Sequence, residues 1–299
     1  MKRHHSLNRW LLVALGLAAT SLVQAGTPVA SAKNPPPAAV DWKVDTISPV
    51  ANPIYFEDPV IRTEIRPIYA YHRIDNGFVS GGGTANVYAL QLRWAVTDRL
   101  AIIATKDGYM DLDTPNLGSP GGWLNIAAGL KYAVIDDKAN QFIVTPGFTF
   151  EIPTGESKVF QGEGNGEWNV FVSAEKGWDK FHLTSNVGIR VPNDSAFSTQ
   201  FHYSLQADYY LNRYFIPFIV ANGYNSVSNG NRLPIDTEGY DVINFGSTKA
   251  AGSIQLTLGA GFRSRVTDHV DFGFAYEKAV VAPEGLTDDR FTFDMSIRF

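Results

Sequence analysis

His182 and His202 are the residues whose types and spacing come nearest to a catalytic set. Each lies on the polar side of a segment that alternates between polar and apolar side chains, and Asn186 and Ser204 share that side. A Ser, a His and an Asn could carry out nucleophilic acyl transfer, in which the His takes the proton of the Ser hydroxyl. The same side also carries Gln and Asp, however, and His residues in such company are more often hydrogen-bonded wall residues. We therefore expect no catalytic residue and no metal site. The function must then be inferred from the strands that carry these side chains.

The last ten residues show most clearly what those elements are. Phe291, Phe293, Met295, Ile297 and Phe299 lie on one side of this segment, and the residues between them are charged or carry a hydroxyl. A strand with two such faces separates lipid from water, and its length fits the ~9–11 residues of a tilted transmembrane β-strand. The ending resembles the C-terminal strand of bacterial outer-membrane barrels, in which a final Phe is an assembly signal. That resemblance implies the same role for Phe299.

Similar alternation recurs along the chain and predicts about 12 strands. The other candidates are residues 63–72, 88–96, 100–106, 124–134, 142–152, 168–174, 181–191, 201–211, 215–224, 254–262 and 270–276. Short connections near 97–99, 136–140, 177–180, 212–214 and 265–269 alternate with longer ones near 73–86, 108–122, 154–166, 192–199, 225–252 and 279–289. An even strand number with this alternation predicts an all-β chain, a transmembrane antiparallel β-barrel of the outer-membrane type, with both termini in the periplasm. A secreted β-sandwich is the alternative, but its strands average nearer ~5–6 residues.

The first 62 residues divide into two segments that precede the barrel, which we place at residues 63–299. Lys2, Arg3 and Arg9 come before an apolar run from Trp10 to about Val23, and small residues suited to cleavage follow at Val23-Gln24-Ala25, with a second possible site at Ala30-Ser31-Ala32. This pattern predicts a cleaved signal peptide over residues 1–25, because the run is shorter than the ~20 apolar residues of a spanning helix. Residues 26–62 are rich in Pro, which cannot donate to a sheet ladder. We expect them to form a periplasmic or lumen-contacting arm.

Composition excludes several classes of function. With no Cys, the chain has no disulfide, no thiolate metal site and no Cys nucleophile. A net charge of −5, with no basic run after the signal peptide, argues against nucleic acid as a partner. We expect no cofactor. The expected partners are outer-membrane lipid and lipopolysaccharide, the barrel assembly machinery and a small-molecule solute.

The polar faces of the strands should line the lumen. The candidate lumen-lining residues are Arg66, Arg93, Lys131, Glu151, Glu175, His182, Arg190, His202, Asp208, Arg263, Asp271, Glu277 and Asp294. Cations and carboxylates nearly balance in this set, which favours ion pairs that stiffen the wall over a selectivity ring of one charge. A barrel of about 12 strands lies between the filled barrels of ~8 strands and the open channels of ~16–18. We therefore expect a narrow lumen, gated by the Asn-, Ser- and Gly-rich loop 225–252 or by the arm.

The middle of the chain resembles a known family. Gly129-Leu-Lys-Tyr132, the Pro-Thr-Gly-Glu sequence that ends at Glu156 and Gly164-Asn-Gly-Glu-Trp-Asn169 look like the GLKY, PTGE/PTGD and GxGxW elements of a group of outer-membrane transporters. These are the transporters grouped with the meta-pathway phenol-degradation proteins. The similarity covers about residues 121–192. It implies a porin-like barrel of a Gram-negative outer membrane that takes up hydrophobic or aromatic compounds, and it supplies no binding residues.

The sequence thus favours a passive channel or facilitator for small molecules over two alternatives. A structural or surface-interaction barrel would act through its loops, and a packed lumen would favour it. A lipid-modifying enzyme would need a Ser, His or carboxylate cluster on the lipid-facing rim, and the sequence shows none.

Overall fold

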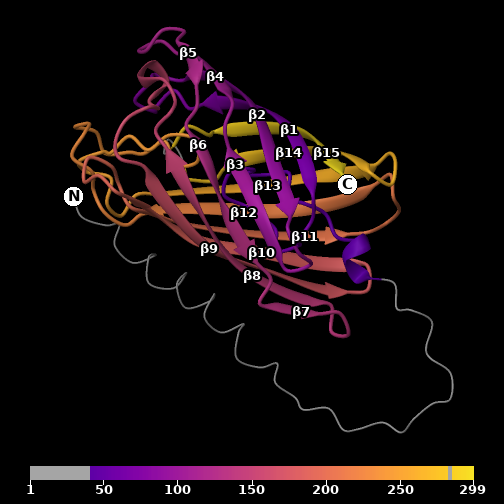
Figure 1. Cartoon of the computed structure of the whole chain (residues 1–299). Coiled ribbons are helices and arrows are strands. Elements are labelled where there is room, and N and C mark those ends of the chain that lie inside the picture. The colour runs from indigo at the N-terminus through magenta and orange to yellow at the C-terminus, as the bar shows by residue number, and fades with distance from the viewer. Residues whose placement is uncertain (1–40, 282–284) are drawn as a thin grey trace, which may run out of the picture. The chain divides into compact units, whose positions relative to one another are not determined.

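The computed structural model describes residues 41–281 and 285–299, and the chain folds there as an all-β barrel (Figure 1). The predicted signal peptide and residues 26–40 of the arm lie outside the described residues. Two short 3-10 helices, η1 (Trp42–Val44) and η2 (Ser157–Val159), accompany the strands. The strands are β1 (Glu64–Ile74), β2 (Gly83–Ala95), β3 (Leu100–Lys106), β4 (Tyr109–Asp113), β5 (Gly121–Trp123), β6 (Ile126–Tyr132), β7 (Ile135–Asp137), β8 (Phe142–Ile152), β9 (Glu167–Trp178), β10 (Phe181–Pro192), β11 (Gln200–Tyr209), β12 (Ile216–Ser226), β13 (Ile254–Arg265), β14 (Val270–Ala279) and β15 (Asp289–Arg298).

All strand pairs are antiparallel, and the sheet closes because β1 pairs with both β15 and β2. The strands fill twelve positions around the wall, because β3 and β4 share one position and β5, β6 and β7 share another. The predicted fold class and strand number are confirmed. One prediction is wrong: residues 108–122, which we expected to form a loop, contain β4 and the first two residues of β5. These two strands extend the wall beyond the barrel rim, at the top of Figure 1.

The strand is interrupted between β3 and β4, which pair with successive parts of β2. The amide of Leu90 in β2 donates to the carboxylate of Asp107 at 2.8 Å, in place of a ladder partner from the neighbouring strand. Gly108 has a φ of 107°, and a Cβ there would lie 2.0 Å from the carbonyl oxygen of Tyr88. Only Gly fits this close approach of two backbones. The shared position of β3 and β4 therefore depends on the Asp107-Gly108 pair.

Connections at the two ends of the barrel differ in length. At the end that holds Phe299, β9 and β10 are joined by residues 179–180 and β14 follows β13 after residues 266–269. At the opposite end, residues 227–253 join β12 to β13 and residues 153–166 join β8 to β9. Outer-membrane barrels keep short turns in the periplasm and long loops outside. The end with the long connections is therefore the extracellular end.

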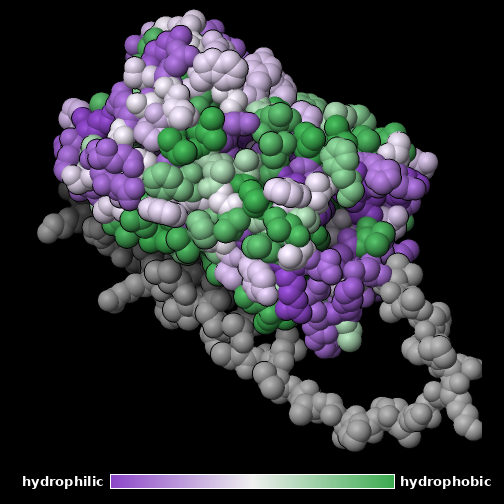
Figure 2. Space-filling view, in the orientation of Figure 1, coloured by the Kyte–Doolittle hydropathy of each residue, from purple (hydrophilic) through white to green (hydrophobic). Residues whose placement is uncertain are grey.

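The outer surface is apolar between the two ends. Large side chains on the outward phase are exposed on successive strands, as in Tyr88, Leu92 and Trp94 of β2. Figure 2 shows apolar side chains gathered across the middle of the visible face, with hydrophilic ones toward its ends. A closed barrel with such a belt is a barrel of the bacterial outer membrane. Within residues 41–281 and 285–299, no helix is long and apolar enough to cross a membrane.

The outward phase can be tested at Val172, which lies near the middle of β9 and is 42% exposed. Val172→Arg should lower the free energy of unfolding by ~2–4 kcal/mol, because it places a charge against the lipid near the bilayer midplane. Reversible denaturant unfolding in lipid vesicles measures the change. Val172→Leu is the control and should change stability little. Equal stability of the two variants would contradict the lipid-facing assignment.

Candidate functional site in the lumen

Residues 46–62 lie inside the barrel and residues 41–45 lie at its periplasmic rim, and we call residues 41–62 the plug. They form no strand, and most of their side chains are buried. Side chains of the wall donate to their backbone carbonyls instead of strand partners. Arg263 donates to Ser48 at 2.9 Å, Gln91 to Pro53 at 2.7 Å, Ser173 to Glu57 at 2.6 Å and Thr145 to Pro59 at 2.7 Å. The wall thus holds an irregular backbone along its length.

The sequence of the plug explains this conformation. Pro49, Pro53 and Pro59 have no amide N–H, so the segment cannot join the sheet as a regular strand. Its apolar side chains instead pack on an apolar strip of the inner wall, at the end near the periplasm. This cluster consists of Ile47, Val50, Ala51 and Phe56 from the plug and Ile216, Phe218, Val220 and Ala275 from the wall.

Ion pairs hold the end of the plug to the wall. The Glu57 carboxylate accepts from the Arg93 guanidinium at 2.6 and 2.9 Å and from the Lys131 ammonium at 2.7 Å. Asp58 pairs with Arg62 at 3.1 Å, and its backbone carbonyl accepts from Lys131 at 2.8 Å. All of these groups are buried or nearly so. Removing one partner from such a group leaves an uncompensated buried charge, which is costly.

Residues 227–253 close the lumen at the extracellular end, and we call them the cap. Asp241 forms an ion pair with Arg290 of the wall, and the carbonyl of Val242 accepts from Lys106 at 3.1 Å. The buried Glu238 carboxylate holds the cap in shape by accepting from the amides of Phe245 at 2.7 Å and Ser247 at 2.8 Å. The loop that we expected to gate the lumen is therefore folded into the barrel mouth.

Arg190 connects the plug to the cap. Its guanidinium lies 4.5 Å from the ring of Tyr55 in the plug and donates to the backbone carbonyl of Tyr240 in the cap. It also pairs with Glu167 at 2.6 Å and donates to Gln200 at 2.8 Å. A single buried cation thus contacts both segments that fill the lumen.

The inner wall is not uniformly polar, contrary to our expectation. At the extracellular end, most inward side chains of β1, β2 and β4 are apolar, with His72 an exception, and apolar side chains of the loops cover them. This cluster includes Ile74, Val87, Met110, Leu112 and Leu124 on the side of the wall and Val242, Ile243, Phe245 and Phe78 on the side of the covering loops. Alternation along one strand separates lipid from interior but does not say whether an inward residue is polar.

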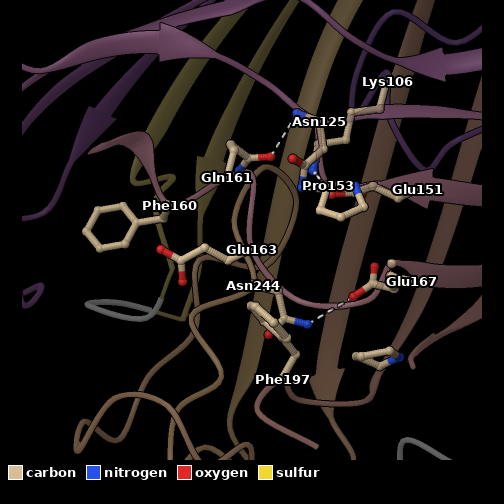
Figure 3. Close-up of a pocket in the computed structure, with 12 residues that line it drawn as sticks. Lys106, Asn125, Glu151, Pro153, Phe160, Gln161, Glu163, Glu167, Phe197 and Asn244 are labelled. Carbon is tan, nitrogen blue, oxygen red and sulfur yellow. Dashed lines mark hydrogen bonds and ion pairs between the residues drawn. The ribbon is translucent and has the colours of Figure 1, made fainter. Parts of the chain in front are cut away.

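A small pocket lies between the wall and the extracellular loops (Figure 3). Lys106, Glu151 and Glu167 come from the wall, Phe160 from the loop that follows β8, and Asn244 from the cap. Its free volume is about 30 Å³, and a second cavity between plug, cap and wall measures about 20 Å³. Each has room for roughly one or two waters. These spaces hold no solute of useful size while the plug and cap are in place.

The structure places all thirteen candidate lumen-lining residues on the inner face. Glu151 is partly buried. The other twelve are buried: Arg66, Arg93, Lys131, Glu175, His182, Arg190, His202, Asp208, Arg263, Asp271, Glu277 and Asp294. Several contact one another along the wall, as Asp294 does in pairing with both Arg66 and Arg263. Glu151 pairs with Lys106, which is not one of the thirteen.

Other members of the set have partners that the sequence did not indicate. Arg190 and Asp208 lie on neighbouring strands, but Arg190 pairs with Glu167 and Asp208 with His182 at 2.9 Å. Asp271 pairs with Arg298 at 2.7 Å. Both carboxylate oxygens of Glu175 are buried without a protein hydrogen-bond partner.

Sequence reasoning missed the carboxylates of the plug and cap. Glu57, Asp58 and Asp241 lie in non-periodic segments, where a face cannot be assigned. The one signal was the run Ile54-Tyr-Phe56 directly before Glu57 and Asp58, because aromatic side chains next to Pro indicate packing rather than an exposed linker. A carboxylate pair that follows such a run should need buried cations.

The His residues belong to the wall network. His182 bonds to Asp208, and His202 bonds to the amide oxygen of Asn169 at 2.8 Å. The Ser204 hydroxyl accepts from Asn52 of the plug at 3.3 Å. Among residues 41–281 and 285–299, no group of three or more His, Asp or Glu side chains is placed to hold a metal ion.

Comparison with known proteins supports the fold. The structure is similar to an outer membrane channel from Pseudomonas putida F1, with a TM-score of 0.61 at 14% sequence identity over 80% of this chain and 96% of that one. It is also similar to the NanC porin, with a TM-score of 0.51 at 10% identity over 79% of this chain and 100% of that one. No protein-family model and no curated protein matches the sequence. The predicted outer-membrane barrel is confirmed, and the relation to the meta-pathway transporters remains a prediction.

The contribution of the Glu57 ion pairs to holding the plug in the lumen can be measured with Glu57→Gln. Loss of this charge leaves Arg93 and Lys131 without their main counter-charge, and a broken buried pair costs ~3–5 kcal/mol. The plug should then leave the lumen more often. Ala51→Cys, buried in the plug, reports this as a faster reaction with a water-soluble thiol reagent, in a chain that has no other Cys. We expect the labelling rate to rise at least about tenfold, which corresponds to ~1.4 kcal/mol.

Glu156→Gln is the matched control for this experiment. It removes a carboxylate from an exposed pair with Lys158, and such pairs contribute ~0–1 kcal/mol. Its labelling rate should equal that of the Ala51→Cys parent. If Glu57→Gln left the rate unchanged as well, the ion pairs would not hold the plug.

Proposed function

We propose that this protein is an outer-membrane channel for small molecules that opens when the plug and the cap leave the lumen. One observation carries the proposal: both segments that fill the barrel belong to no barrel strand. Apart from backbone hydrogen bonds at Ser226, where the cap leaves β12, their contacts with the wall are ion pairs, side-chain hydrogen bonds and apolar packing. Their departure breaks no hydrogen bond between neighbouring strands, so the wall persists around an opened lumen.

A structural barrel that never opens is the second candidate. The small interior cavities favour it, since the described lumen has no room for a solute. The size of the wall argues the other way. Barrels of ~8 strands are filled by the side chains of their own wall, whereas this wall of twelve positions is filled by added segments of chain.

We further propose that the solutes are small hydrophobic or aromatic molecules. The support is the apolar inner surface formed by β1, β2 and β4 at the extracellular end, now covered by Val242, Ile243 and Phe245 of the cap. When the cap leaves, this surface is open to a solute that enters from outside. Burial of apolar surface stabilises such a solute there by roughly 25 cal/mol per Å².

Conductance of four proteins tests the channel. They are the mature chain, a variant without residues 41–58, a variant in which a short Gly-Ser turn replaces residues 232–248, and the combination of both. In planar bilayers the parent should conduct rarely, each single variant more often, and the combination steadily. Ion selectivity should be weak, because cations and carboxylates of the inner wall pair with one another.

Add-back of the plug controls for damage to the barrel. A peptide of residues 41–58, supplied on the periplasmic side, should close the variant that lacks these residues, and a scrambled peptide should not. If the combined variant folds, as judged by heat-modifiable mobility on gels, and conducts nothing, the protein is a structural barrel.

The solute class is tested by the same combined variant. Benzyl alcohol should reduce its ion current at lower concentration than a polar solute of similar size such as ribitol, because the ring binds the apolar inner surface. Met110→Ser lies in that surface and should weaken the block by benzyl alcohol alone. Equal block by both solutes would argue against a hydrophobic substrate without affecting the channel proposal.

A further inference from the structure

Four charged residues form a group on the outside of the barrel at its extracellular end. Arg73, Asp289 and Lys278 lie side by side on β1, β15 and β14. Asp288 directly precedes β15. The Arg73 guanidinium donates to Asp289 at 2.6 Å and to Asp288 at 3.0 Å, and the Lys278 ammonium donates to Asp288 at 2.5 Å. The carboxylates therefore fix the positions of both cations.

This group presents positive charge although its formal charges cancel. The side chains of Arg73 and Lys278 are 56% and 42% exposed, whereas those of Asp288 and Asp289 are 9% and 10% exposed. The carboxylates lie behind the cations, against the wall. A ligand that approaches from outside meets the guanidinium and ammonium first.

An aromatic row lies directly beside the charged row, toward the middle of the barrel. Tyr71, Phe291 and Tyr276 are neighbours on the same three strands, with ring centroids 6.3 and 5.0 Å apart. The Tyr276 hydroxyl donates to Asp289 at 2.6 Å and joins the two rows. The three rings line an open hollow of about 430 Å³ together with Arg73 and Asp289. Lys278 lies beside the hollow, with its ammonium 3.4 Å from the Asp289 carboxylate.

The position of the hollow determines what can fill it. Aromatic side chains on the outside of barrels mark the boundary between acyl chains and head groups. The cations lie one row farther out on the extracellular side, so they meet the head groups of the outer leaflet. Anionic phosphate on a sugar head group is complementary to an exposed guanidinium and ammonium above aromatic rings.

We propose that this hollow binds a phosphorylated glycolipid of the outer leaflet, the lipopolysaccharide class. Arg73 and Lys278 contact a phosphate of the head group, and Tyr71, Tyr276 and Phe291 contact the adjoining sugar and the start of an acyl chain. Asp288 and Asp289 are positioning residues that keep the two cations in place. The site is independent of whether the lumen opens.

Lipid binding by the purified mature barrel tests the site. Native mass spectrometry would compare a bisphosphorylated lipid A, the same lipid after removal of its phosphates, and inorganic phosphate. The parent should bind the phosphorylated lipid at least about tenfold more tightly than the other two. Arg73→Gln combined with Lys278→Gln should lose most of this preference, because it removes both cationic donors to the phosphate.

Arg213→Gln is the matched control. Arg213 is also exposed, paired with Asp268 at 2.9 Å and close to an aromatic ring, that of Tyr214, but it lies in a periplasmic turn. This variant should bind lipid as the parent does. If the double variant does not fold, Lys278→Gln alone replaces it, because it leaves Arg73 paired with both carboxylates. This single variant should lose part of the preference for phosphorylated lipid.

Two results would overturn the proposal. One is equal binding of phosphorylated and dephosphorylated lipid by the parent, which would make the contact a purely apolar one. The other is full retention of the phosphate preference by a folded double variant, which would place the phosphate elsewhere on the barrel.

Discussion

The space enclosed by a wall of twelve strand positions is the constraint on which the rest of the structure depends. Such a wall is too wide for its own inward side chains to fill, and buried polar groups must have hydrogen-bond partners. The plug fills the enclosed space and also supplies hydrogen-bond partners to polar side chains of the wall. Its Pro-interrupted backbone supplies carbonyls with no ladder partner, and Gln91, Ser173 and Thr145 of the wall supply the donors.

The same constraint makes the plug and the cap depend on each other. Glu277 of the wall accepts from the Asn52 amide of the plug at 3.4 Å and from Arg290 at 2.7 Å, and Arg290 in turn binds Asp241 of the cap. Arg190 links the two segments in a similar way from the other side of the lumen. Departure of one segment leaves buried charges that hold the other less well. Under the proposed channel function, this coupling favours states in which both segments are in the lumen or both are out of it.

The side chains that face the lipid could be predicted from the sequence alone. Strict alternation, as in Phe291, Phe293 and Met295, assigns every second residue to the lipid because side chains on a strand alternate between its faces. The twelve strand positions of the wall and the periplasmic position of the short turns follow from the same pattern, but β4 and β5 do not. The charged row of Arg73, Asp289 and Lys278 was not visible in this way, because it needs the register of β14, β15 and β1.

The sequence by itself determined the barrel, its place in the membrane and the inward phase of residues such as Arg93, Lys131 and Asp294. Only the tertiary structure decided what those residues bind. Arg93 and Glu57 are 36 positions apart, and Glu57 lies in a segment with no periodicity that could assign it a face. Alternation is a local property of one strand, whereas the partner of a buried charge depends on strand register and on which other segment enters the lumen. For that physical reason the charge balance was predictable and the plugged state was not.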